Sequence, residues 1–136
     1  MPAEFRIKRR IAFAETDMAG VLHFSNYFRL MEEVEHEFWR SLGLTVFDRE
    51  REPNLSWPRV SVNCEYQAPL RFEDEVELHL VVNRVGSKAI EFSVEFWHGG
   101  KRCAIGKITA VCCITGRHGD FAATAIPEGI RKKLGG

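Results

Sequence analysis

One segment of the chain, residues 26–42, differs from the rest in the spacing of its apolar residues. They recur at intervals of three and four, and Arg29, Glu32 and Glu33 fill the opposite side. The apolar residues of the segment are Tyr27, Leu30, Met31, Val34, Phe38 and Leu42. This spacing is typical of an amphipathic helix with one buried face, and Gly43 favours its termination. The fold must therefore bury one long helix against another layer.

Five other runs alternate apolar and polar residues, as half-buried strands do. The first covers residues 5–13, and the others centre on residues 60–66, 76–82, 90–96 and 104–114. The turn sequences VGSK and HGGK separate the last three runs, which should therefore pair antiparallel in chain order. We expect an α+β fold in which an antiparallel five-stranded sheet wraps around one long central helix.

Composition limits the classes of function. The length of 136 residues indicates a single domain over residues 1–136. Lys plus Arg and Asp plus Glu number 19 each, so no positive field favours nucleic acid. The start of the chain lacks an apolar signal region, and no window approaches the run of about 18 apolar residues of a membrane-spanning helix, which predicts a cytoplasmic protein without a membrane span. The 4 cysteines lack C-x-x-C spacing, so we expect neither a metal site nor disulfides.

The stretch ETDMAGVLHFSNYF, just before the helix, concentrates polar residues. Asp17 stands in a D-x-x-G sequence that is common in turns where the aspartate accepts backbone hydrogen bonds. Gly20 is a position that needs positive φ or close approach of another group. Ser25 or Asn26 can cap the helix. From these residues alone, Asp17 is either a turn residue or an acid that takes part in chemistry.

The combined pattern resembles the signature of the 4-hydroxybenzoyl-CoA thioesterase family of hotdog-fold proteins. In that family a strand leads into D-x-x-G, two hydrophobic residues and then N-Y at the start of the central helix. The matching positions are Asp17, Gly20, Val21, Leu22, Asn26 and Tyr27. YQAPLRFEDEVELHL also resembles the segment that joins the family's second and third strands. The resemblance covers roughly residues 5–130 and implies a hotdog-fold acyl-CoA thioesterase.

The resemblance implies roles at the start of the helix. Asp17 would act as a nucleophile or as a general base on water, and both roles stay open. The backbone amide of Phe24 would polarise the thioester carbonyl. Many relatives carry a tyrosine followed by a histidine where this chain has His23 and Phe24, so the histidine is displaced by one position. His23 is either a surface histidine or a group that contacts substrate or moves a proton.

The resemblance also implies a set of substrate-binding positions. These are Gly20, Asn26, Tyr27, Trp57, Arg59 and Lys88. Trp57 and Arg59 would line the acyl pocket, and Lys88, like Arg84, would lie near the nucleotide of coenzyme A. Core packing for Tyr27, a helix cap for Asn26 and a solvated hairpin charge for Lys88 are the alternatives. Coenzyme A enters as part of the substrate, so no separate cofactor is expected. In the family it threads between subunits, which implies a homodimer or homotetramer.

Two other functions remain open at this point. A non-catalytic hotdog protein that binds acyl-CoA would retain the same fold. Hotdog dehydratases also place a histidine before the central helix, but their helix entry carries a Pro-Gly pair, which residues 24–30 lack. An acid on the helix is a further possibility, yet Glu32 and Glu33 lie off its apolar side.

Overall fold

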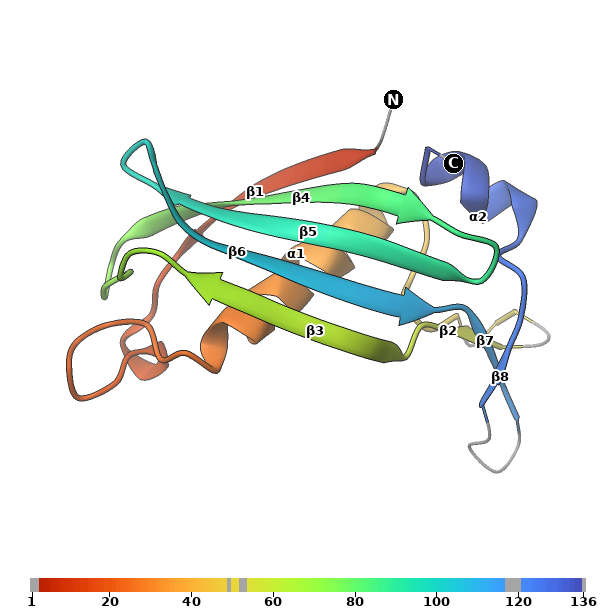
Figure 1. The fold of residues 1–136 in the computed structure, drawn as a ribbon, viewed down its shortest axis with the longest axis horizontal. Coiled ribbons are helices and arrows are strands. Elements are labelled where there is room, and N and C mark those ends of the chain that lie inside the picture. Colours follow the sequence, from red (N-terminus) through yellow and green to blue (C-terminus); the bar gives the residue numbers. More distant parts are fainter. Residues whose placement is uncertain (1–2, 49, 52–53, 117–120, 136) are drawn as a thin grey trace.

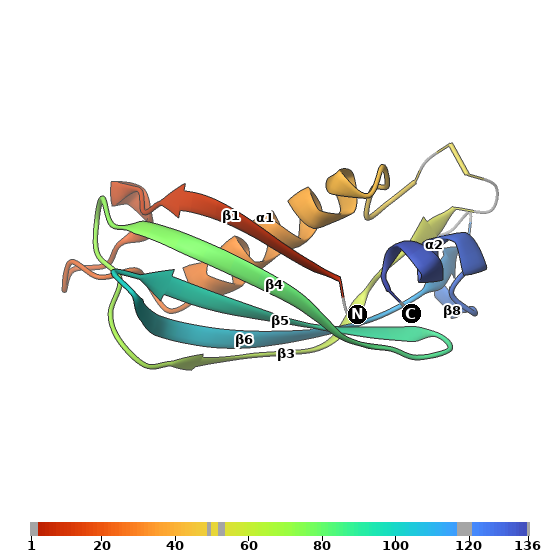
Figure 2. The same cartoon turned by 90° about the horizontal axis from the view of Figure 1, so that it is seen from above.

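The main sheet contains five antiparallel strands in the order β1, β4, β5, β6 and β3. The computed structural model describes residues 3–48, 50–51, 54–116 and 121–135. The strands are β1 (Glu4–Arg10), β3 (Arg59–Tyr66), β4 (Glu75–Val85), β5 (Ala89–His98) and β6 (Lys101–Val111). One long helix, α1 (Asn26–Ser41), lies across one face of this curved sheet (Figures 1 and 2). The α+β arrangement expected from the sequence is confirmed.

The apolar stripe of α1 packs against the sheet and is almost completely buried. Leu30, Met31 and Val34 are 0% exposed. Close approach of α1 to β6 depends on Gly106, because a Cβ at that position would lie 2.4 Å from the Met31 Cε. The helix stops where Gly43 takes a positive φ of 75°, as its position in the sequence indicates.

Shorter elements close the end of the molecule that lies away from the start of α1. They are β2 (Leu55–Ser56), β7 (Cys113–Thr115), β8 (Phe121–Ala123) and α2 (Glu128–Lys133). The three strands form a second small sheet in the order β2, β7, β8 (Figure 1). The run expected as one strand over residues 104–114 therefore divides at Cys112 between two sheets. None of the described helices has the length and apolar character needed to cross a membrane.

The first strand ends at Arg10, three residues earlier than its alternation predicts. A short 3₁₀ helix, η1 (Phe13–Glu15), follows it. The physical reason is local: the Glu15 carboxylate accepts a hydrogen bond from the Ala12 N–H at 2.8 Å, and Thr16 bonds to the Phe13 carbonyl. These bonds turn the chain away from the sheet and leave the Phe13 ring 73% exposed.

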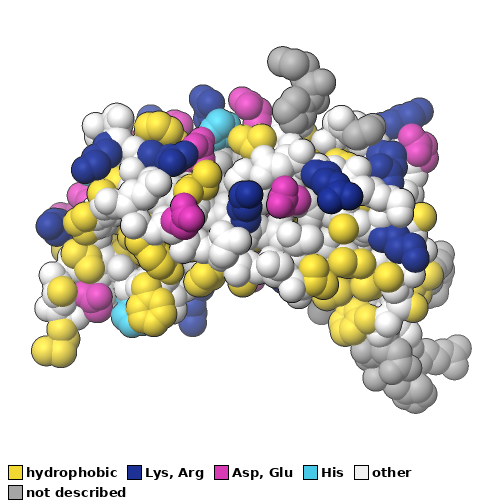
Figure 3. Space-filling model, viewed as in Figure 1, with side chains coloured by type: hydrophobic (Ala, Val, Ile, Leu, Met, Phe, Trp, Pro, Cys, Tyr) yellow, Lys and Arg dark blue, Asp and Glu magenta, His cyan; other side chains and the backbone are white. Residues whose placement is uncertain are grey.

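The two faces of the sheet differ in character. The face that turns away from α1 carries charged side chains of both signs (Figure 3), with ion pairs such as Arg102 to Glu95. Edge strand β3 departs from the expected half-buried pattern, since Val60 and Val62 are 62% and 49% exposed. This strand lies at the edge of the sheet farthest from β1, so an apolar surface remains uncovered in the single chain.

Candidate active site

Asp17 lies in a tight loop between η1 and α1. Its N–H donates to the Val21 carbonyl at 2.9 Å, and its own carbonyl accepts from the Gly20 N–H at 2.9 Å. The carboxylate Oδ1 accepts from the N–H groups of Ala19 and Val21, at 2.9 and 3.4 Å. Gly20 has a φ of 81°, as the D-x-x-G pattern indicates. The turn interpretation of Asp17 is therefore correct for Oδ1, whereas Oδ2 accepts no hydrogen bond from any described residue.

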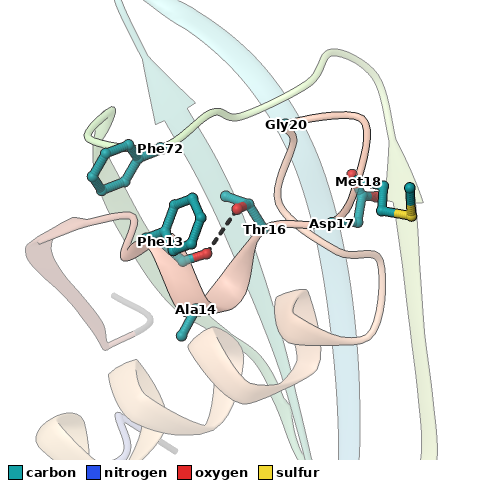
Figure 4. A pocket seen from close by; sticks show the side chains of 7 residues that line it. All are labelled: Phe13, Ala14, Thr16, Asp17, Met18, Gly20 and Phe72. Atoms are coloured by element: carbon teal, nitrogen blue, oxygen red, sulfur yellow. Dashed lines mark hydrogen bonds between the residues drawn. The ribbon is translucent and has the colours of Figure 1, made fainter.

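Two concave regions of the surface meet at Asp17. The larger has a volume of about 880 Å³ and is lined by Phe13, Ala14, Thr16, Asp17, Met18, Gly20 and Phe72 (Figure 4). The second, of about 380 Å³, is lined by Asp17, Val21, Leu22, Phe24, Tyr27, Tyr66, Gln67, Ala68 and Pro69. Among these lining residues Asp17 carries the only charge. One carboxylate thus stands in an otherwise largely apolar cleft.

Aromatic rings form part of the wall of the larger region. Phe13 and Phe72 meet edge to face with their centroids 5.6 Å apart. Figure 4 shows this pair on one side of the region and Asp17 with Met18 on the other. Phe13, Phe72 and Met18 are all largely exposed. Their exposure leaves a wall that can accept a flat apolar group.

Phe24 lies at the entrance to α1 and lines the second region with Asp17. The Tyr66 hydroxyl donates to the Phe24 carbonyl at 3.0 Å, which fixes this residue against β3. No described residue accepts a hydrogen bond from the Phe24 N–H. Amides at a helix start carry partial positive charge, so a free N–H here suits an oxygen that gains negative charge.

His23 is held beside this entrance by local contacts. Its Nδ1 lies 2.8 Å from the Ser25 Oγ, and its ring stacks on that of Phe24 with centroids 4.6 Å apart. His23 is not among the lining residues of either region. Neither Ser25 nor Asn26 caps α1 through its side chain, contrary to expectation. Asn26 instead donates from Nδ2 to the Glu15 carbonyl at 2.8 Å and so holds the loop.

Tyr27 lies in the wall of the second region but belongs to the core. It is 3% exposed, and its ring meets that of Tyr66 edge to face at 4.7 Å. Burial raises the pKa of Tyr27 to about 12. Its phenol therefore remains protonated at neutral pH.

Trp57, Arg59 and Lys88 lie away from Asp17 within the single chain. Trp57 is buried against Trp39, with ring centroids 5.0 Å apart. Arg59 begins β3 and Tyr66 ends it, which separates them by about 23 Å. Lys88 is an exposed residue of the β4–β5 hairpin, at the opposite end of the sheet from the Asp17 loop (Figure 1). Their roles in substrate binding stay predictions.

Two inward-facing charges, Glu35 and Arg9, were not predicted from the sequence. Glu35 on α1 is 0% exposed, accepts from the Trp39 Nε1 at 3.0 Å and pairs with Arg59. Burial raises the pKa of Glu35, although Arg59 acts in the opposite direction. Arg9 points from β1 toward α1 and pairs with Glu15 and Glu33. A signal exists for both residues, because each charge interrupts an apolar face: Glu35 follows Met31 by four, and Arg9 follows Ile7 by two.

The other acids of the helix lie where the sequence indicates. Glu32 is exposed, and Glu33 is half-buried through its pairing with Arg9. Neither lines the regions around Asp17. Among the described residues, no group of three or more His, Cys, Asp or Glu side chains could hold a metal ion.

Comparison with known proteins identifies the family. The sequence profile of the Thioesterase-like superfamily matches residues 11–134. A 1,4-dihydroxy-2-naphthoyl-CoA hydrolase of Synechococcus sp. (strain RCC307) is 31% identical over 126 residues, which cover 90% of this chain and 94% of that protein. A crystal structure of a hypothetical protein from Aquifex aeolicus is 30% identical with a TM-score of 0.86, covering 96% of this chain and 98% of the other. A gentisyl-coenzyme A thioesterase superposes with a TM-score of 0.83 at 25% identity, covering 96% and 99%. The chain therefore belongs to the thioesterase-like superfamily of hotdog-fold proteins.

Proposed function

We propose that the protein hydrolyses an acyl-CoA thioester to a carboxylic acid and free coenzyme A. The observation that carries this proposal is the arrangement around Asp17. Its Oδ2 accepts no hydrogen bond from the described residues, and Asp17 carries the only charge among the residues that line the cleft. Phe24, whose N–H has no described acceptor, lines the same cleft. A base or nucleophile and an oxyanion donor are the two groups that thioester hydrolysis requires.

Two routes use the same residues. In the first, Asp17 takes a proton from water as the water oxygen attacks the thioester carbon. In the second, Oδ2 attacks that carbon itself, and water then hydrolyses the mixed anhydride. In both, the Phe24 N–H stabilises the oxygen that becomes negative, the C–S bond breaks, and the sulfur of coenzyme A leaves as a thiol after protonation. Water is the only co-reactant in either route.

The acyl group that we propose contains an aromatic ring. The Synechococcus relative is named for a dihydroxynaphthoyl thioester and the structural neighbour for a gentisyl thioester. In this chain, Phe13 and Phe72 present an exposed edge-to-face pair beside Asp17. A flat ring can stack against such a wall, which supports an aromatic acyl group over a long aliphatic one.

We also propose that the working form is a homodimer or homotetramer. Asp17 is exposed in the single chain, as are the apolar side chains of Met18 and Phe24 around it. Exclusion of water strengthens the electrostatic effects on which both routes depend, and a second copy would cover this surface. Lys88 would then bind coenzyme A only if the assembly brings it to the cleft. Sedimentation velocity tests the assembly, and a monomer at micromolar concentration would contradict it.

The test of activity is release of free thiol from a panel of aromatic and aliphatic acyl-CoA esters. We expect turnover of the aromatic esters and a loss of at least about a hundredfold in kcat for Asp17→Asn, by comparison with the loss of other groups that act on the transition state. Glu128→Gln removes a carboxylate from α2, remote from the cleft, and is the matched control. If the wild-type protein binds acyl-CoA but releases no thiol from any ester, it is a non-catalytic acyl-CoA-binding protein instead.

A further inference from the structure

Arg9 is the point where three parts of the chain meet near the Asp17 loop. The alternation of β1 places it on the same side as Phe5 and Ile7, so its guanidinium faces α1 rather than solvent. Its side chain is only 22% exposed. An arginine in this position needs partners, because a half-buried cation without them is unfavourable.

Its partners come from two different elements. The Glu15 carboxylate, in η1, accepts from both terminal nitrogens of Arg9, with the Nη2–Oε2 distance at 2.5 Å. The Glu33 carboxylate, in the second turn of α1, accepts from Nε at 3.2 Å and from Nη2 at 3.1 Å. Paired bonds of this kind fix the planes of both groups, which a lysine could not do. The hydrogen bond from Arg9 lowers the pKa of Glu15, so this carboxylate remains ionised at neutral pH.

Glu15 forms hydrogen bonds to residues on both sides of the loop that carries Asp17. Its carboxylate accepts from the Ala12 N–H, and its backbone carbonyl accepts from the His23 N–H at 2.9 Å and from the Asn26 Nδ2 at 2.8 Å. Asp17 follows Glu15 by two residues, and Phe24 follows His23 by one. The position of Glu15 therefore sets the separation between the Asp17 carboxylate and the Phe24 amide.

We propose that Arg9 is a positioning residue for catalysis: by binding Glu15 and Glu33 together, it holds the loop that carries Asp17 against the start of α1. The inference rests on the proposed thioesterase function. Without Arg9, Glu15 would be a carboxylate without its cation in a site that is only 18% exposed. The Glu15 side chain would turn toward water and displace the neighbouring backbone. The Asp17 carboxylate and the Phe24 N–H would then no longer be positioned together around the thioester carbon.

The main test compares kcat and KM for Arg9→Met with those of the wild-type protein. A displacement of about 1 Å in a reacting group can cost about a hundredfold, so we expect kcat to fall about 10- to 100-fold while KM changes less than about threefold. Arg9→Lys keeps the charge without the paired bonds and should recover only part of the loss. Arg10→Met is the matched control, since Arg10 lies on the outer side of β1 and bonds to the Glu73 carbonyl.

Coupling to Asp17 distinguishes positioning from a general loss of stability. If Arg9 acts through Asp17, adding Arg9→Met to Asp17→Asn should lower kcat less than threefold further, because the group being positioned is already absent. Unchanged kcat in Arg9→Met, or a full additional loss in the double variant, overturns the proposal. Should Arg9→Met fail to fold, Arg9→Lys takes its place, and wild-type kcat in that variant overturns it equally. Absence of thiol release by the wild-type protein would instead refute the proposed function, before any variant is compared.

Discussion

Replacement of Arg59 by methionine tests the buried ion pair beneath β3. The change removes the cation from Glu35, which is 0% exposed, and leaves the Trp39 Nε1 as its hydrogen-bond donor. Breaking a buried pair by removing one partner costs about 3–5 kcal/mol, because the remaining charge stays in the interior. With a urea m-value of about 2 kcal/mol per M, the unfolding midpoint should fall by about 2 M at pH 8.

The loss of stability in Arg59→Met should increase as the pH rises. Burial already raises the pKa of Glu35 above its ordinary value of 4.5, and Arg59 opposes that rise. Loss of Arg59 therefore raises the pKa further in the folded protein only. The folded state then holds a proton that the unfolded state releases, so stability falls as pH rises from the unfolded pKa to the folded one. The variant should approach wild-type stability near pH 5 and differ most at pH 8.

Urea unfolding followed by tryptophan fluorescence at pH 5 and pH 8 measures both effects. Arg10→Met, which removes an exposed partner of Glu75, should cost less than about 1 kcal/mol at either pH. Glu35→Gln added to Arg59→Met should restore stability at pH 8, since an amide can still accept from Trp39 without a charge. A loss for Arg59→Met below about 1 kcal/mol at pH 8, or one that is the same at both pH values, would refute a buried charge as its cause.

Three further experiments test other parts of the fold. Gly106→Ala should lower the free energy of unfolding by about 1–3 kcal/mol, because the new methyl group displaces Met31. In urea unfolding, the double variant with Met31→Ala should lose less stability than the sum of the losses of the two single variants. Gly20→Ala meets no neighbouring atom within 4 Å, so only its positive φ is penalised; thermal unfolding should show a loss of about 1–2 kcal/mol, and a larger loss would indicate a contact. Burial raises the pKa of Cys64 and of Cys112 to about 11 from 9.0, so alkylation by iodoacetamide at pH 8, followed by mass spectrometry, should be at least about a hundredfold slower than in urea; equal rates would contradict this.

The apolar repeat predicts the main elements of this fold because it reports burial directly. The helix over residues 26–42 follows from it, and the turn sequences VGSK and HGGK add the antiparallel pairing of β4, β5 and β6. The positions of β1 and β3 at the two edges of the sheet were not predicted. The repeat fails where a charge occupies an inward position, as at Arg9 and Glu35, because it assigns every charge to solvent. It also fails at edge strand β3, where Val60 and Val62 have the spacing of a buried face but nothing in the single chain covers them.

The sequence predicts only the local part of the candidate site. The D-x-x-G sequence determines the turn at Asp17, since a short stretch of chain makes all of its hydrogen bonds. The separation of Asp17 from the start of α1, in contrast, depends on the pairing of Arg9 in β1 with Glu33 in α1, which lies 24 residues away along the chain. A local pattern cannot report such long-range contacts.

The fold itself explains why the candidate site forms at this end of the molecule. A single helix laid across the sheet has only one N-terminus, and the loop that enters it must leave the neighbouring end of β1. Asp17 and Phe24 are therefore brought together by chain connectivity, and the bridge between Thr16 and Leu22 closes the loop between them. The ion pair of Glu35 with Arg59 lies farther along the helix, at the first residue of β3. We therefore expect Arg59→Met to change the urea midpoint and Arg9→Met to change kcat.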